Sequence, residues 1–314
     1  MSTVLVTGGA GFIGRWVVRA LLDEGADVVA LDDYTNGSPD NLAEFASEPR
    51  LDLVEGSIAD PQAVERVFRA RPDLVLHLAA RINVQHSIDD PIGTYEPDVM
   101  GTLRVLEAAR AGGAPFLFMS SCMVYAAAGD DPIAETHPVR PASPYAASKL
   151  AGEELTISYG LSYGHPVTVV RPFNTYGPFQ RTDGEGGVVA IFCERALDGH
   201  DIAVFGDGTQ TRDLLYVADC AEFVLRAARA DAARGELLNA GTGHDVTIND
   251  LAEIVGGGEV GVRHVEHPHP QAEIARLVCD HRKAEQVLGW RPQTTLERGI
   301  AETKDWIRSR DGGR

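Results

Sequence analysis

The sequence has few residues that could cross-link the chain or bind a metal. Only four of its 314 residues are cysteines, and their spacing matches neither a CxxC pair nor a zinc-binding pattern. A chain of this length can bury a full core without disulfides or metals. We therefore expect reduced thiols, no metal site and a cytoplasmic location. The four cysteines are Cys122, Cys193, Cys220 and Cys279.

The sequence also lacks long apolar runs and an excess of basic charge. No segment approaches the roughly 20 consecutive apolar residues of a membrane helix, and the first residues lack the basic start of a signal peptide. Acidic residues outnumber basic ones by 46 to 28, which gives a formal net charge of −18. We therefore expect no nucleic-acid or membrane partner. An anionic metabolite can still bind if a few arginines line its site.

Short apolar runs alternate with amphipathic segments over the first half of the chain. Residues 4–6 form an apolar run that ends in glycines, apolar residues recur at helical spacing over 12–22, and 28–33 is a second run. This order is a βαβ unit and predicts a parallel sheet. Residues 173–190 are rich in Gly, Pro and polar groups, as expected of a substrate-facing loop. Further strands are expected over 51–56, 73–80, 115–121 and 166–172, and helices over 61–70, 101–111 and 143–159.

A glycine-rich turn joins the first strand to the first helix. Gly8, Gly11 and Gly14 form a GxxGxxG pattern in the strand–turn–helix context that dinucleotide binding requires. Glycines let backbone N–H groups and the helix N-terminus approach a pyrophosphate closely. Asp32 follows the second strand, where a carboxylate accepts hydrogen bonds from the adenosine ribose and repels a 2′-phosphate. These features predict NAD as the cofactor, in preference to NADP.

A tyrosine and a lysine are spaced to share one helix face. Tyr145 and Lys149 form a YxxxK pair in the helix expected over 143–159. A tyrosine with a pKa of about 10 is a poor base at neutral pH, but a nearby ammonium group and the positive nicotinamide ring stabilise the phenolate. Ser121 ends the preceding strand, where its hydroxyl can bridge substrate and phenol. After a dinucleotide-binding start, this trio predicts a hydride-transfer enzyme.

Motifs from residue 3 to residue 292 carry a resemblance to a known family. They are TGGAGFIG, HLAA, SSCMVY, SPYAASK, RPFNTYGP, GDGTQTRDLLYV and LGWRP. The chain resembles the extended short-chain dehydrogenase/reductase family, in particular its nucleotide-sugar epimerases and dehydratases such as those acting on UDP-sugars. The resemblance implies an α/β fold: a Rossmann-type doubly wound parallel sheet with a smaller C-terminal α/β substrate-binding domain. It also implies a homodimer.

The same resemblance assigns domains and site residues. The NAD-binding domain is expected over 1–171 with a returning segment at about 212–240, and the substrate-binding domain over 172–211 and 241–314. Ser121, Tyr145 and Lys149 match the catalytic trio. For the substrate, the matching positions are Asn174 and Arg212 at the phosphates, Val188 and Val189 at the nucleotide, and also Phe205 and Arg276. For the cofactor, they are Gly8, Gly11, Phe12, Ile13, Gly14, Asp32, Asp33, Ser57, Ile58, Leu78, Ala79, Ala80, Tyr145, Lys149 and Pro172.

The residues after Ser121 bear on the type of reaction. Both epimerases and dehydratases of this family first oxidise the sugar at C4 to a keto group, but a dehydratase also needs an acid and a base to expel the C6 hydroxyl. Dehydratases typically carry an Asp-Glu pair where this chain has Cys122 and Met123. A thioether cannot exchange a proton, whereas a thiol can. A nucleotide-sugar 4-epimerase is therefore favoured.

The alternatives to the 4-epimerase stay open. One is a 4,6- or 5,6-dehydratase in which Cys122 acts with a carboxylate or imidazole from elsewhere, for which His86 and Glu185 are candidates. The others are a nucleotide-glucuronate decarboxylase and a non-catalytic NAD-binding protein of the same fold.

Three positions depart from the family's usual residues. Asp98 stands where the family usually has Asn, and a buried carboxylate there would need a partner. Residues 270–273 lack an arginine usual in epimerases, so His269 or Arg276 is expected to replace it at the diphosphate. Ala126 replaces a glycine.

Overall fold

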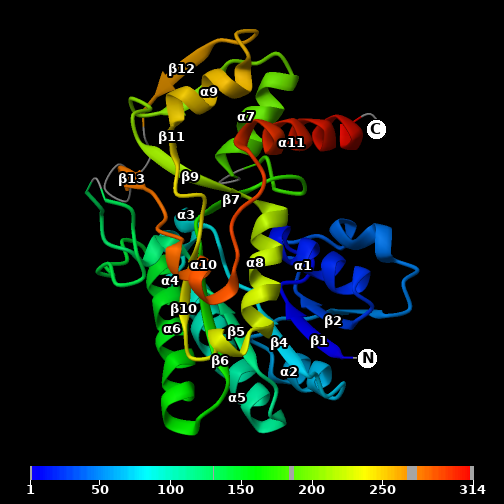
Figure 1. Ribbon diagram of the computed structural model, residues 1–314. Helices are drawn as coiled ribbons and strands as arrows, with labels where there is room; N and C mark the ends of the chain where they lie inside the picture. Colours follow the sequence, from blue (N-terminus) through cyan, green and yellow to red (C-terminus); the bar gives the residue numbers. More distant parts are fainter. Residues whose placement is uncertain (1, 130, 184–186, 267–273, 312–314) are drawn as a thin grey trace.

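The protein is built around one seven-stranded parallel sheet (Figure 1). The computed structural model describes residues 2–129, 131–183, 187–266 and 274–311. The strand order is β10-β6-β5-β4-β1-β2-β3. The bounds are β1 (Thr3–Thr7), β2 (Asp27–Asp32), β3 (Leu51–Glu55), β4 (Leu74–His77), β5 (Phe116–Met119), β6 (Val167–Pro172) and β10 (Leu237–Ala240).

Helices cover both faces of this sheet because its strands are apolar on both sides. In β1, Val4 and Val6 pack with one buried cluster and Leu5 with the other, as the alternation of side chains along a strand requires. The first cluster includes residues of α1 and α8, and the second includes residues of α2, α5 and α6. The sheet is therefore doubly wound, as expected. The bounds are α1 (Phe12–Asp23), α2 (Pro61–Phe68), α5 (Thr102–Gly112), α6 (Pro144–Tyr163) and α8 (Val217–Arg229).

A smaller set of sheets and helices is built mostly from the C-terminal half. Strand β9 pairs with β7, β11 and β13, and β8 pairs with β12. These strands and the helices α7, α9 and α11 gather at one end of the molecule (Figure 1). A third apolar cluster there contains residues of β7, β8, β9, α7, α9 and α11. The strands are β7 (Asn174–Tyr176), β8 (Ile202–Phe205), β9 (Thr211–Tyr216), β11 (Asp245–Thr247), β12 (Val262–Val265) and β13 (Arg276–Leu277). The helices are α7 (Val188–Leu197), α9 (Ile248–Gly256) and α11 (Leu296–Asp311), and α10 (Arg282–Leu288) packs near β10.

Short helices fill the segment between β4 and α5, which the sequence pattern did not predict. They are α3 (Val84–Asp89), α4 (Pro91–Tyr95) and a π-helical turn over Glu96–Gly101. The segment contains two prolines, and each stands in the first turn of its element, where proline is tolerated. The Asp90 carboxylate accepts a hydrogen bond from the Gly93 amide at 2.9 Å and begins α4. Proline here marks helix starts rather than a loop.

Two features are absent from the part of the chain that the structure describes. No helix there is both long enough and apolar enough to cross a membrane. Nor do His, Cys, Asp and Glu side chains there gather in groups of three or more that could hold a metal ion.

Candidate active site

A cavity of about 460 Å³ opens where the strand order of the large sheet reverses. Strand β1 pairs with both β2 and β4. Helix α1, which follows β1, packs on one face of the sheet, and α5, the first long helix after β4, packs on the other. Ligands of open α/β sheets bind in the crevice at this switch point. The cavity begins at the glycine turn after β1, passes the ends of β2, β4, β5 and β6, and reaches the start of α7.

The glycine turn is packed too closely for side chains. Gly8 has a φ of +72°, and a Cβ there would lie 2.8 Å from the Ala79 nitrogen. A Cβ on Gly14 would lie 2.0 Å from the Gly8 carbonyl oxygen. Because these positions carry no side chain, α1 can pack directly against the end of β1. The N-terminus of α1 then forms part of the cavity wall. This arrangement suits a dinucleotide pyrophosphate.

The end of β2 carries the polar groups expected at the adenosine. Asp32 is 7% exposed and accepts hydrogen bonds from the amides of Ala10 and Tyr34 at 3.0 and 2.8 Å. Burial raises the pKa of this carboxyl, and the amide bonds oppose the rise. The Asn36 amide donates to the Ala80 carbonyl at 2.8 Å and joins this loop to the end of β4.

The three residues expected to catalyse hydride transfer meet in the middle of the cavity. Tyr145 and Lys149 come from the first turns of α6, which begins at Pro144 and is capped by the Ser143 hydroxyl. The Lys149 ammonium donates to the Met119 carbonyl at 2.9 Å. Ser121 follows β5 and lies within hydrogen-bonding reach of the Tyr145 phenol.

Burial dominates the electrostatics of this trio. It raises the pKa of Tyr145, while the hydrogen bond with Ser121 opposes that rise. It also lowers the pKa of Lys149, and the nearby carboxylates of Asp98 and Glu153 oppose that change. The positive ring of a bound nicotinamide would add the charge that favours the phenolate.

Cys122 and Asn174 line the next part of the cavity, together with Val188 and Val189 from the start of α7. The Cys122 sulfur lies 3.9 Å from the Asn174 side-chain oxygen. Burial raises the pKa of the Cys122 thiol to about 12, although the charge of Arg212 opposes the rise. The thiol is therefore protonated at neutral pH and can donate a hydrogen.

Three of the expected substrate residues lie outside the cavity lining, on the smaller sheets. Phe205 ends β8 with 49% of its surface exposed. Arg212 on β9 donates to the carbonyls of Thr211 and Ile274 at 2.7 and 2.9 Å. Arg212 lies opposite Leu277 of the paired strand β13, and Leu277 follows Arg276 in the chain.

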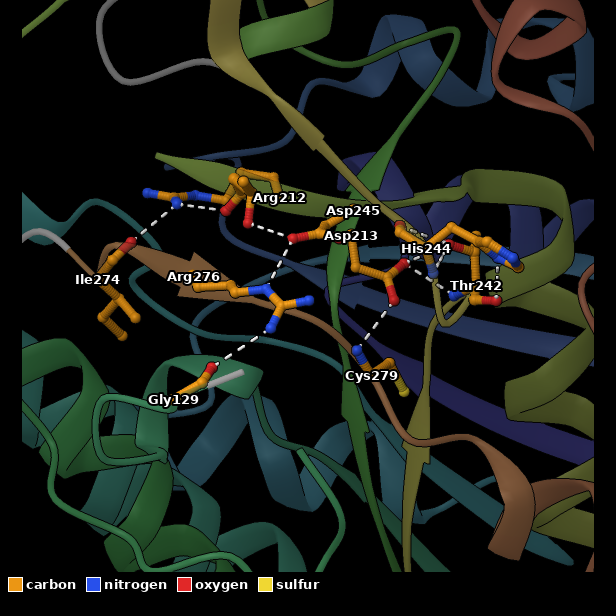
Figure 2. A network of polar contacts seen from close by, with 10 residues as sticks. Gly129, Arg212, Asp213, Thr242, His244, Asp245, Ile274, Arg276 and Cys279 are labelled. Carbon is orange, nitrogen blue, oxygen red and sulfur yellow. Dashed lines mark hydrogen bonds and ion pairs between the residues drawn. The ribbon is translucent and has the colours of Figure 1, made fainter. Parts of the chain in front are cut away.

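Figure 2 shows how the two arginines are held on these neighbouring strands. Arg276 is paired with Asp245 at 3.0 Å, and Asp245 also accepts from the Thr211 hydroxyl at 2.6 Å. Arg276 further reaches the Gly129 carbonyl at 3.5 Å, in the loop that follows Ser121. The structure therefore brings Arg212 and Arg276 together, and Arg212 acts electrostatically on Cys122.

The remaining expected cofactor residues line the cavity except Ser57, which lies beside Ile58. The structure adds lining residues that the sequence patterns did not identify, among them Asn36, Gly37, Arg81, Asn83, Phe179, Gln180 and Arg181. Asn-Gly after the second strand was an available turn signal. The last three fall in the Gly- and Pro-rich segment expected to face the substrate, but no pattern singled them out.

The residues that could replace a dehydratase's acid or base, and those that depart from the family's usual residues, lie at separate places in the chain. His86 is exposed on α3 and lies apart from the cavity lining. Glu185, His269 and residues 270–273 lie outside the described residues. The buried Asp98 does have partners, because it accepts from the Arg81 amide at 2.7 Å and from the Ser148 hydroxyl at 2.9 Å.

Comparison with known proteins places this site in a family. The profile described as NAD dependent epimerase/dehydratase family matches residues 4–241. The UDP-glucose 4-epimerase of Mycolicibacterium smegmatis is 38% identical over 98% of both chains. A dTDP-glucose 4,6-dehydratase of Neisseria meningitidis serogroup B is 34% identical over 98% of this chain and 93% of the relative.

Solved structures give the same result. Pal from Bacillus thuringiensis is 50% identical with a TM-score of 0.96, covering 98% of this chain and 99% of its own. The UDP-glucose 4-epimerase of Thermotoga maritima, solved with UDP-glucose, is 34% identical with a TM-score of 0.92 at the same coverage. With its seven-stranded parallel sheet, glycine turn and Ser–Tyr–Lys trio, this chain belongs to the NAD-dependent epimerase/dehydratase family.

Proposed function

We propose that the protein is a nucleotide-sugar 4-epimerase, acting on a UDP-sugar through a transient 4-keto intermediate. The observation that carries the proposal is the position of Ser121, Tyr145 and Lys149. They stand between a wall suited to a dinucleotide and a compartment that opens toward Asn174 and α7. Relatives named UDP-glucose 4-epimerase, similar over nearly their whole length, support the same choice of reaction.

The trio has the chemistry that oxidation at C4 needs. Bound NAD supplies a hydride acceptor that becomes the donor in the return step. Tyr145 takes the proton of the sugar hydroxyl, and Ser121 holds that hydroxyl and the phenol in line. Lys149 stabilises the phenolate and is held in place by the Met119 carbonyl. An epimerase then lets the keto sugar turn over, so that hydride returns to the opposite face.

The substrate's nucleotide end is assigned in this proposal to the smaller sheets. Arg212 and Arg276 on β9 and β13 supply two guanidinium groups suited to a diphosphate. Phe205 presents an exposed ring at the end of β8, which suits stacking on a base. Binding there would direct the sugar past Asn174 toward Tyr145, because Arg212 already lies close enough to influence Cys122.

A second candidate function rests on Cys122. Its thiol is buried, protonated and on the cavity wall, one residue from Ser121. A thiol there could protonate the C6 hydroxyl of a 4-keto sugar as it leaves. The second candidate is therefore an NDP-sugar 4,6- or 5,6-dehydratase.

One experiment separates the two reactions. The wild type and Cys122→Ala are incubated with UDP-, dTDP-, GDP- and CDP-sugars, and products are followed by mass and NMR. An epimerase gives unchanged mass with inverted C4, and Cys122→Ala keeps most of its activity. Loss of water in the wild type, with NADH accumulating in Cys122→Ala, would replace the epimerase by the dehydratase. Tyr145→Phe should abolish hydride transfer in either case.

The proposal includes a homodimer in a reducing compartment. Large apolar side chains are exposed on α3, α4 and α6, which pack together, and Ile92 on α4 is 80% exposed. Pairing of these helices between two copies would cover this surface. All four cysteines are free thiols. Light scattering should give a dimer mass that Ile92→Glu lowers toward the monomer.

A further inference from the structure

Two adjacent carboxylates at the carboxyl end of β2 have different partners. Asp32 is almost fully buried and accepts its hydrogen bonds from the amides of Ala10 and Tyr34. The Asp33 side chain is 28% exposed and is paired with the guanidinium of Arg81. Asp32 is thus held by neutral donors, whereas Asp33 is matched by a full positive charge.

Arg81 reaches Asp33 from the segment that follows another strand of the sheet, β4. Its Nη2 lies 3.0 Å from one carboxylate oxygen and its Nη1 lies 3.5 Å from the other. The Arg81 amide donates to Asp98 at 2.7 Å, which fixes the start of the side chain. Arg81 follows β4 and Asp33 follows β2, and β1 lies between these strands. The ion pair therefore spans the carboxyl end of β1, where the glycine turn begins.

The pair belongs to the cofactor end of the cavity. Asp32, Asp33, Asn36 and Arg81 all line the cavity that contains the glycine turn. A ribose hydroxyl bonded to Asp32 would have Asp33 and its guanidinium partner as neighbours, and any 2′-substituent must fit among these charges. A 2′-phosphate carries at least one full negative charge and is attracted by a guanidinium that lacks a carboxylate partner.

Asp33 is ionised at neutral pH, so the pair is ionic. Burial tends to raise the pKa of Asp33, but hydrogen bonds from Thr35 and the charge of Arg81 outweigh it and place the pKa below its usual value. Arg81 is thus neutralised locally, and a 2′-phosphate would meet the uncompensated charge of Asp32 instead.

We propose that Asp33 sets the preference for NAD by occupying Arg81, a cation that would otherwise bind a 2′-phosphate. The discrimination then rests on two carboxylates with separate tasks. Asp32 holds the ribose and repels a phosphate. Asp33 pairs with Arg81, the one guanidinium near it among the described residues that line the cofactor end of the cavity, and so keeps that guanidinium from a 2′-phosphate. Proteins often gain specificity by removing or opposing interactions that would favour the wrong ligand.

The test measures the binding of NAD and of NADP alone, without a sugar substrate, so that no reaction takes place. Dissociation constants are determined by calorimetry on protein stripped of copurified dinucleotide. Asp33→Asn should lower the ratio of the NADP to the NAD dissociation constant by about 3- to 10-fold, the range for a partly exposed charge–phosphate contact. Arg81→Gln in the wild-type background should raise the ratio, because Asp33 then adds an unpaired negative charge.

The double variant and a matched control make the test specific. In Asp33→Asn/Arg81→Gln the gain in NADP affinity should disappear, since it depends on the released guanidinium. Glu65→Gln breaks an exposed Arg69–Glu65 pair of 3.1 Å at the C-terminal end of α2 and should leave the ratio unchanged. An unchanged ratio in Asp33→Asn, confirmed folded by circular dichroism, would overturn the proposal, as would a gain that persists in the double variant. These outcomes do not depend on which sugar is the substrate.

Discussion

Single residues set the charge balance around Tyr145, the proposed catalytic tyrosine. Asp98 is the clearest case, because it is buried beside α6 and bonded to Ser148, the neighbour of Lys149. Its carboxylate opposes the fall in the pKa of Lys149 and adds to the rise in the pKa of Tyr145. A neutral side chain at this position would remove both effects.

We predict that Asp98→Asn shifts the pH dependence of kcat. Without the carboxylate the pKa of Tyr145 falls, so the acidic limb of the profile should move to lower pH. A charge about 10 Å away in a medium of effective dielectric constant near 20 changes a pKa by about one unit. The profile is measured on the identified substrate, with Asp52→Asn on the exposed face of β3 as the control. An acidic limb that stays in place would contradict this account of Asp98.

Arg212 supports a prediction about substrate binding. If it holds the diphosphate, Arg212→Ala should raise KM by about 10- to 150-fold, since hydrogen bonds to charged groups contribute roughly 1.5–3 kcal/mol. The effect on kcat should be much smaller. Steady-state kinetics with Arg308→Ala, an exposed residue of α11, provide the comparison. A KM equal to that of the control would place the diphosphate elsewhere.

At the scale of elements, a buried ion pair joins α6 to β6. Glu153 and Arg171 form two hydrogen bonds of 2.8 and 2.5 Å, with side chains 1% and 4% exposed. The Arg171 guanidinium also lies over the Tyr125 ring at 4.6 Å. Glu153 lies on α6 one turn beyond Lys149, and its pairing with Arg171 of β6 holds in place the helix that carries Tyr145 and Lys149.

We predict that Glu153→Gln lowers the free energy of unfolding by about 3–5 kcal/mol, because it leaves a buried guanidinium without its charge partner. The value is measured by urea unfolding. Glu65→Gln removes the same charge from an exposed pair and should cost less than about 1 kcal/mol. Similar losses in the two variants would show that the buried pair does not stabilise the fold as argued.

At the scale of the whole molecule, the cavity joins the large sheet to the smaller sheets. Its lining comes from the carboxyl ends of β1 to β6 in the large sheet, from α1 and α6, and from β7, β9 and α7. Ligands bound there should therefore stabilise the folded chain as a unit.

We predict that NAD raises the melting temperature more than NADP at equal concentration. Saturation at 100 times the dissociation constant adds about 2.7 kcal/mol to the stability of the folded state. Thermal unfolding followed by circular dichroism measures the shift. A larger shift with NADP would contradict the roles given to Asp32 and Asp33.

Sequence patterns predicted many of the residues that line the cavity but not all of the residues beside them. Local patterns identified the glycine turn, Asp32, and the spacing of Tyr145 and Lys149, because each depends on residues close together in the chain. Arg81 was missed because its significance depends on Asp33, which is distant in sequence but adjacent across β1. The short helices before α5 were missed because proline in a first helical turn resembles proline in a loop.

The sequence by itself determined the parallel sheet, the dinucleotide turn and the helix that carries Tyr145 and Lys149. Hydrophobic periodicity and glycine spacing act over one element or one turn, so they can be read without knowing the fold. Only the tertiary structure decided which charges meet. It paired Arg81 with Asp33 and Arg276 with Asp245, and it gave Asp98 its partners. Such pairings depend on strand order and register, which local sequence does not specify.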